Sequence, residues 1–170
     1  MNSLHTDRLI IRNFQPDDWQ DLQELVVQYQ ASEWAKYEDP WPTGTEEVKG
    51  MAKFFASGDD FLAVIRRDTG KLIGLIAIER RKEQEERVHN LGYVFHPGYY
   101  GQGYATEGCR TVMTYLFDVV GIAAILTGTR LENTPSVRLL ERLGLHSIGQ
   151  GEFHISKEEW LAQQKASQSQ

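Results

Sequence analysis

The feature that most limits how this chain can fold is a glycine-rich loop between a strand pattern and a helix pattern. The loop reads Pro97-Gly98-Tyr99-Tyr100-Gly101-Gln102-Gly103-Tyr104-Ala105-Thr106. A strand pattern over residues 88–95 precedes it, and apolar residues at helical spacing follow it over residues 104–119. Glycines let the backbone turn tightly and approach a ligand, and the free N–H groups of a helix start favour anions. We interpret this segment as a phosphate cradle.

The remaining patterns predict a mixed α/β (α+β) fold. Helical spacing marks residues 16–29, 45–55 and 133–143, and short apolar runs mark strands at residues 9–11, 61–65, 71–78, 123–129, 145–148 and 152–155. The turn Asp68-Thr69-Gly70 makes 61–65 and 71–78 a hairpin. This order is not the regular alternation of strands and helices that builds an all-parallel sheet.

The length and charge of the chain favour one domain. We predict a single domain over residues 1–170, with a disordered tail from about residue 163 to residue 170. Residues 79–87 are nearly all charged, and we interpret them as a solvated strand end and loop. A net charge of −6 would repel a phosphate backbone, so we expect no nucleic-acid partner.

The apolar segments are too short for a membrane protein. The longest apolar run, residues 72–78, is far short of the roughly 20 residues that cross a bilayer, and the first residues form no apolar signal region. We therefore expect no membrane partner and a cytoplasmic protein.

The glycine-rich loop over residues 97–106 matches two familiar types of phosphate-binding loop poorly. A Walker A loop needs Gly-Lys-Ser/Thr, but Tyr104-Ala105 follow Gly103. A dinucleotide loop needs glycine or alanine where Thr106 stands, and an acidic residue about 20 positions further on, after a parallel strand. Neither condition is met well.

Three segments, in the correct order, instead resemble the GNAT superfamily of N-acetyltransferases. Tyr100-Gly101-Gln102-Gly103-Tyr104-Ala105 is similar to its pyrophosphate loop, Gln/Arg-x-x-Gly-x-Gly/Ala, with a tyrosine at the first position. The segment from Asn133 to Leu145 is similar to its Asn-x-x-Ser/Ala motif and the helix that follows. Thr6-Asp7-Arg8-Leu9-Ile10-Ile11-Arg12 resembles the opening of the branch that holds the ribosomal-protein N-terminal acetyltransferases. The resemblance covers about residues 4–160.

The resemblance implies a fold and a reaction. The fold would be a mostly antiparallel central sheet with a splayed pair of strands and flanking helices. The reaction would be direct attack of a primary amine, either a protein N-terminal α-amine or a small-molecule amine, on the thioester of acetyl-CoA. We expect acetyl-CoA as co-substrate and no metal. Such folds commonly dimerise through sheet edges, so a homodimer is one alternative for the oligomeric state.

The resemblance also assigns a set of cofactor-binding residues. These are the backbone at the end of the fourth strand, the loop, and the helix after Asn133: Val94, Phe95, His96, Gly101, Gln102, Gly103, Tyr104, Ala105, Thr106, Asn133, Ser136 and Arg142. Asn133 would hydrogen-bond the pantetheine arm, or serve only as a helix cap. Arg142 would reach the phosphates, or lie in solvent.

The catalytic residues that we assign are Ser136, Asn133 and His89. Ser136 would donate a hydrogen bond to the leaving sulfur or to a bound water, or be only a polar residue at a helix start. His89 would act as the base, although strand alternation sends it to the face opposite Asn90, where an exposed histidine is the simpler interpretation.

Two positions depart from the family pattern and leave a second hypothesis open. Asn90 stands where the branch often has glutamate, and Leu140 stands where many members have tyrosine. The alternative function is therefore a catalytically inactive CoA-binding module. If the chain is active, the missing glutamate favours an α-amine or another amine of low pKa. An α-amine, with a pKa of about 7.7–8.0, loses its proton more easily than a lysine-like amine with a pKa of about 10.4.

An aromatic and acidic stretch is the candidate substrate site. Trp34, Tyr37 and Glu38 fall where the family has its substrate loop, and they would hold the amine or relay a proton through water. The alternative is an ordinary solvated loop.

Overall fold

The computed structural model describes residues 1–81 and 87–169. The interpretation of residues 79–87 as a solvated loop falls mainly on residues 82–86, which lie outside the described residues.

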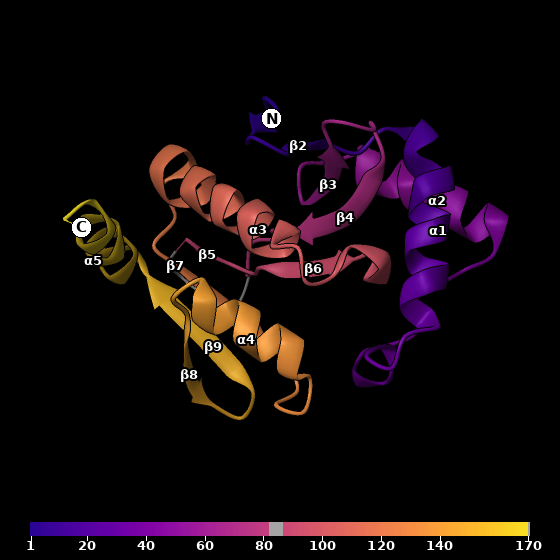
Figure 1. Ribbon diagram of the computed structural model, residues 1–170. Coiled ribbons are helices and arrows are strands. Elements are labelled where there is room, and N and C mark those ends of the chain that lie inside the picture. Colours follow the sequence, from indigo (N-terminus) through magenta and orange to yellow (C-terminus); the bar gives the residue numbers. More distant parts are fainter. Residues whose placement is uncertain (82–86, 170) are drawn as a thin grey trace.

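The strands form two sheets (Figure 1). The described strands are β1 (Leu4–His5), β2 (Leu9–Asn13), β3 (Phe61–Arg66), β4 (Leu72–Ala77), β5 (Val88–His89), β6 (Gly92–Phe95), β7 (Ala124–Gly128), β8 (His146–Gly149) and β9 (Glu152–Ser156). The first sheet has the order β1-β2-β3-β4-β6, and all its pairs are antiparallel. The second has the order β5-β7-β9-β8, in which only the β5–β7 pair is parallel.

The two sheets meet and then separate along one extended segment. β5 pairs with β7, and after Asn90 and Leu91 the same segment continues as β6, which pairs with β4. The buried Thr127 hydroxyl donates to the Leu91 carbonyl oxygen at 3.0 Å and links the sheets at this point. The predicted mixed sheet with a splayed pair of strands is therefore confirmed.

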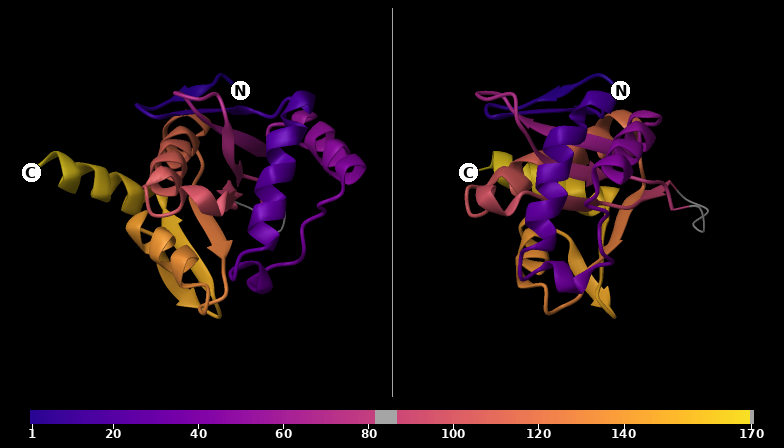
Figure 2. Two further views of the ribbon diagram at one scale, coloured as in Figure 1. Left: turned by 45° about the vertical axis from the view of Figure 1, so that its right-hand side comes forward. Right: turned by 90° about the vertical axis from the view of Figure 1, so that its right-hand side faces the viewer.

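Helices cover both faces of the first sheet (Figures 1 and 2). The helices are α1 (Trp19–Gln30), α2 (Thr45–Ala56), α3 (Tyr104–Thr114), α4 (Thr134–Arg142) and α5 (Lys157–Gln168). β3 shows how one strand serves two cores: Leu62 and Val64 join the cluster under α3, whereas Ala63 and Ile65 join the cluster under α1 and α2. This alternation follows from the period of two of a strand.

The glycine loop leads into α3 as predicted, but the far end of that helix differs. The α-helix ends at Thr114, and a π-helical segment, Tyr115–Val120, completes the predicted span. Gly121, with φ of 75°, then ends the helix in the left-handed conformation that glycine favours.

The tail is not disordered as predicted: residues 163–168 belong to α5. The Ser156 hydroxyl accepts the Glu159 N–H at 3.2 Å, and the Glu159 carboxylate accepts the Ser156 N–H at 2.7 Å, forming a capping box. Trp160 is 1% exposed and stacks on Phe117 with ring centroids 5.4 Å apart. This capped and anchored first turn holds a helix whose remaining residues are mostly polar, and α5 projects from the body opposite α1 and α2 (Figure 2).

The described helices are all too short or too polar to cross a bilayer.

Candidate active site

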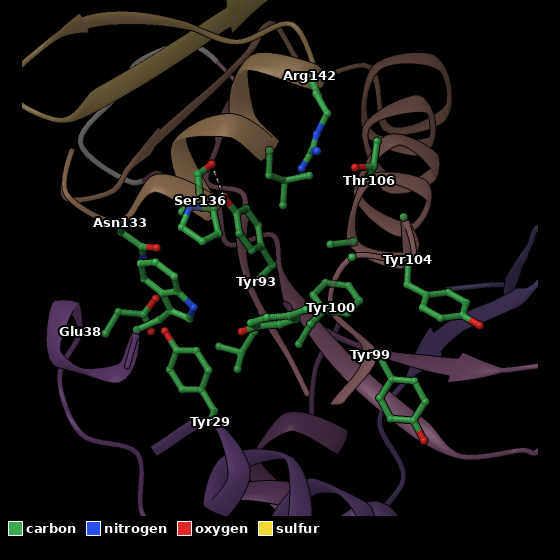
Figure 3. A pocket seen from close by; sticks show the side chains of 18 residues that line it. Tyr29, Glu38, Tyr93, Tyr99, Tyr100, Tyr104, Thr106, Asn133, Ser136 and Arg142 are labelled. Atoms are coloured by element: carbon green, nitrogen blue, oxygen red, sulfur yellow. Dashed lines mark hydrogen bonds between the residues drawn. The ribbon is translucent and has the colours of Figure 1, made fainter. Parts of the chain in front are cut away.

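A cavity of about 460 Å³ opens beside β6, after the chain passes from the second sheet into the first (Figure 3). Its walls come from α1 and the segment after it, from β6, from the glycine loop with the start of α3, and from α4. The lining residues are Tyr29, Trp34, Glu38, Tyr93, Val94, Phe95, Tyr99, Tyr100, Gly101, Gly103, Tyr104, Ala105, Thr106, Asn133, Pro135, Ser136, Leu139 and Arg142. Twelve residues that we assigned from the sequence therefore line one cavity.

The glycine loop presents backbone donors to this cavity. Gly101 and Gly103 have φ of 75° and 82°, a left-handed conformation that favours glycine. The first backbone hydrogen bond of α3 runs from Glu107 N–H to the Gly103 carbonyl oxygen at 3.0 Å. The N–H groups of residues 104–106 consequently have no partner within the helix. These donors suit a phosphate group, and Arg142 faces them across the cavity (Figure 3).

An ion pair braces the loop from outside the cavity. Arg8 donates to the Glu107 carboxylate at 2.7 Å and to the Gln102 carbonyl oxygen at 2.9 Å, and its guanidinium lies 4.3 Å from the centre of the Tyr104 ring. The Thr6 hydroxyl also donates to Glu107 at 2.6 Å. Burial opposes ionisation of Glu107, but the hydrogen bonds from Thr6 and Arg8 outweigh it and lower the pKa of the carboxyl. Glu107 is thus aimed away from the cavity.

One carboxylate stands at the opposite end of the cavity. Among the described residues that line the cavity, Glu38 alone carries an acidic side chain. The Tyr29 hydroxyl points toward it (Figure 3). Burial and the charge of Glu38 raise the pKa of Tyr29, and they raise the pKa of Tyr100 to about 12. Both tyrosines therefore stay protonated as hydrogen-bond donors around an acidic, aromatic mouth.

Two hydroxyls meet near the middle of the cavity. The Tyr93 hydroxyl lies 2.8 Å from Ser136 Oγ and 3.3 Å from the Ser136 carbonyl oxygen, to which it can donate (Figure 3). Burial raises the pKa of Tyr93, although the hydrogen bond with Ser136 opposes this shift. Tyr93 is consequently a stable O–H donor next to Ser136.

The start of α4 supplies a further polar group. Asn133 is 6% exposed and occupies the N-cap position, yet its side chain makes no capping hydrogen bond. Its amide is therefore available to the cavity, which argues against a purely capping role. Leu140, at the position where many GNAT members have tyrosine, is 1% exposed and packs in the core beneath α4.

Four residues that we assigned from the sequence do not line the cavity: His89, His96, Gln102 and Tyr37. His89 Nδ1 lies 2.7 Å from the Ile78 carbonyl oxygen, so the geometry gives no support to His89 as a base. His96 Nδ1 instead accepts the Gly98 N–H at 2.9 Å and supports the turn before the loop. Gln102 is exposed and offers its carbonyl oxygen to Arg8. Tyr37 stacks on Trp34, with ring centroids 6.3 Å apart, and lines a neighbouring groove.

Sequence reasoning gave no role to three tyrosines of the cavity. Tyr29 lies in the helix predicted over residues 16–29, Tyr93 in the strand predicted over residues 88–95, and Tyr99 in the glycine-rich loop. A tyrosine at a core position should have been a signal, because a buried hydroxyl needs a hydrogen-bond partner.

Known proteins are similar to this chain in sequence. A family model described as an Acetyltransferase (GNAT) domain matches residues 8–146. The uncharacterized N-acetyltransferase YnaD of Bacillus subtilis is 31% identical over 145 residues, which are 85% of this chain and 82% of that protein.

Solved structures share the fold. A GNAT-family acetyltransferase from Bacillus anthracis superposes with a TM-score of 0.81 at 24% identity, covering 92% of this chain and 99% of that one. The ribosomal-protein-S5-alanine acetyltransferase of Vibrio fischeri gives 0.80 at 14% identity, with coverage of 94% and 99%. A spermidine N-acetyltransferase of Vibrio cholerae, in complex with CoA and spermine, gives 0.75 at 18% identity, with coverage of 92% and 99%. The sequence match and the cavity agree: the chain belongs to the GNAT acetyltransferase family and is an acetyl-CoA-dependent N-acetyltransferase.

Proposed function

We propose that this chain acetylates a primary amine that enters the cavity beside Glu38 and attacks the thioester of acetyl-CoA bound along β6 and the glycine loop. The observation that carries the proposal is the polarity of the cavity. Anion-binding N–H groups and Arg142 lie at one end, and a carboxylate lies at the other. A cofactor with phosphates at one end and a cationic amine at the other match these two charges.

The chain offers acetyl-CoA a matching set of contacts. The free N–H groups of residues 104–106 and the Arg142 guanidinium would hold the pyrophosphate. The unpaired edge of β6, which lines the cavity with Val94 and Phe95, would pair with the pantetheine arm as an added strand does. The amide of Asn133 would hydrogen-bond the same arm. The thioester, once bound, supplies the activated acetyl group.

Glu38 is the proposed acceptor for the amine proton. An amine attacks only in its neutral form, and a positioned general base contributes about 10²–10⁴ in rate. Before the proton moves, the carboxylate and the faces of the surrounding aromatic rings would also attract the ammonium form. Glu38 would thus bind the amine and then deprotonate it, directly or through one water.

Ser136 and Tyr93 are the proposed donors to the leaving sulfur. Their oxygens lie 2.8 Å apart. One hydroxyl can therefore donate to the sulfur while it accepts a hydrogen bond from the other hydroxyl. The raised pKa of Tyr93 keeps its proton on the phenol until negative charge develops on the sulfur. This pair would fill the role that Leu140 leaves vacant.

Two kinds of amine fit this site. The neighbours of the same fold are named for a ribosomal-protein alanine and for spermidine, and both are primary amines that carry positive charge at neutral pH. An acidic mouth suits either kind. The pH at which the rate levels off would distinguish them, near the amine pKa of about 7.7–8.0 for a peptide and of about 10.4 for a lysine-like amine.

The test is acetyl transfer to a panel of peptides, polyamines, amino acids and aminoglycosides by the wild type and by Glu38→Gln. We expect at least one amine to be acetylated and Glu38→Gln to lower kcat/KM for that amine by about 10²–10⁴. Glu33→Gln is the matched control, because Glu33 is an exposed carboxylate of the same segment that does not line the cavity. Equal activities of the two variants would remove Glu38 from the mechanism, and no transfer to any amine would contradict the proposed function.

A further inference from the structure

A cluster of potential metal ligands lies apart from the acetyl-transfer cavity. His146, His154 and Glu159 offer three ligand atoms that all lie within 4.8 Å of one another. They come from β8, β9 and the first turn of α5, and none of them lines the cavity. The resemblance to the GNAT superfamily led us to expect no metal, and the sequence analysis gave no role to these three residues.

Strand register brings the two histidines together. In the antiparallel β8–β9 pair, His146 stands directly opposite His154, so both side chains lie on the same face of the hairpin. Their ring centroids are 5.7 Å apart. A change of register by one residue would send one ring to the other face.

The carboxylate is held in place by the start of α5. The Glu159 side chain accepts the Ser156 N–H at 2.7 Å, which anchors it over the end of β9. From this position one carboxylate oxygen lies 3.5 Å from His146 Nδ1, and the other lies 3.9 Å from His154 Nδ1. Strand register and the capping hydrogen bond therefore bring these three side chains together.

The ligand atoms lie farther apart than they would around a bound zinc ion, but within reach of it. Bond lengths of about 2.0–2.2 Å and tetrahedral angles place neighbouring ligand atoms about 3.3 Å apart. The three ligand atoms lie within 4.8 Å of one another, so they must close by up to about 1.5 Å, which rotation of the exposed side chains can supply. The side chains of His146, His154 and Glu159 are 50%, 32% and 46% exposed, so an ion can enter from solvent and water can complete its coordination.

We propose that His146, His154 and Glu159 form a binding site for a divalent transition-metal ion of the zinc type, which fastens α5 to the β8–β9 hairpin. Two imidazoles and one carboxylate are ligands that suit Zn²⁺ and disfavour Mg²⁺. The bound ion joins three elements at their exposed ends, next to the point where Trp160 anchors α5. It lies outside the reaction chemistry and stabilises the C-terminal part of the fold.

The test is titration of the untagged, metal-free protein with Zn²⁺ by calorimetry, without acetyl-CoA or amine. We expect one ion per chain, a rise in the midpoint of thermal unfolding with Zn²⁺, and no response to Mg²⁺. His154→Gln and Glu159→Gln should each weaken binding by at least about tenfold, the smallest loss typical even of an outer-shell partner of a metal site. Glutamine at position 159 can still accept the capping hydrogen bond.

His5→Gln is the matched control, since His5 is an exposed histidine whose described partner is Ser3. It should bind Zn²⁺ as the wild type does. The unfolding midpoints without metal are measured first, and His146→Gln replaces any variant that fails to fold. Zn²⁺ binding that is absent from the wild type, or that is equally strong in the histidine and glutamate variants, would overturn the proposal. Acetyltransferase activity does not enter this readout.

Discussion

The two ends of the cavity are built in different ways. The proposed cofactor end is mainly backbone, namely two glycines at positive φ, the free N–H groups of α3 and the unpaired edge of β6, to which the side chains of Asn133 and Arg142 are added. The amine end consists of side chains, Tyr29, Trp34 and Glu38, from a helix and the segment after it. Backbone recognition depends on a few small residues at set spacing, whereas side-chain recognition can change by substitution without disturbing the fold. We therefore expect the proposed cofactor end to vary little within the family and the proposed amine end to set the specificity.

The largest expected effect at the cofactor end comes from Gly74→Ala. Gly74 pairs with Phe95, and a Cβ at this position would lie 2.6 Å from two atoms of the Phe95 ring. Overpacking of this kind costs about 1–3 kcal/mol, so we expect the free energy of unfolding to fall by that amount. Because Phe95 lines the cofactor end, KM for acetyl-CoA should rise while KM for the amine does not.

Denaturant unfolding measures the free energy, and steady-state kinetics measure the two KM values. Gly58→Ala, where a Cβ meets nothing within 4 Å, is the control; an equal loss there would refute the packing argument.

Gly103→Ala addresses the loop itself. At φ of 82°, an alanine would adopt a left-handed conformation that costs roughly 1–2 kcal/mol. Since 1.4 kcal/mol corresponds to tenfold, KM for acetyl-CoA should rise about 5- to 30-fold if the loop avoids the strain by moving. Gly50→Ala in α2, where a Cβ also meets nothing within 4 Å, should leave this KM unchanged. A larger effect on the amine KM than on the acetyl-CoA KM would break the division of the cavity into two ends.

The hydroxyls of Tyr93 and Ser136 lie between the two ends, and substituting each of them tests whether the two hydroxyls act together. Tyr93→Phe and Ser136→Ala each remove one partner of the 2.8 Å contact. A hydrogen bond contributes about 0.5–1.5 kcal/mol, so each variant should lower kcat about 2- to 12-fold with little change in either KM. The double variant should lose less than the product of the two single losses, because the residues share one interaction. Fully multiplicative losses would show that the two hydroxyls act separately.

The smallest expected effect concerns the Arg8–Glu107 brace outside the cavity. The two side chains are 42% and 23% exposed, and such pairs contribute about 0.2–1 kcal/mol. Since the folded-state pKa of Glu107 is lowered from its ordinary 4.5, its contribution is present above about pH 4.5 and is lost as the pH falls through the folded-state value. Unfolding by urea at pH 7 and pH 4 should show that Glu107→Gln is less stable than the wild type at pH 7, with a smaller loss at pH 4. Equal differences at the two pH values would contradict this assignment.

The sequence was most informative where function depends on local backbone. The glycine loop, the start of α3 and the segment Asn133–Ser136 could be predicted, because each lies within a few residues of contiguous chain. The tail was predicted wrongly, although Ser156 and Glu159 already have the spacing of a capping box. The local signal was present there, but what stabilises the helix in addition is the burial of Trp160 against Phe117, which lies 43 positions away along the chain.

The sequence alone was enough to identify the family and the order of the elements, and it predicted most of the residues of the proposed cofactor end. These follow from glycine conformation, helix starts and strand periodicity, which act over short stretches of chain. Only the tertiary structure placed Tyr93 beside Ser136, directed Tyr29 toward Glu38, kept His89 outside the cavity and gathered His146, His154 and Glu159 at one point. These relations depend on strand register and on how helices dock, and they join residues that are distant in sequence, so no local pattern encodes them.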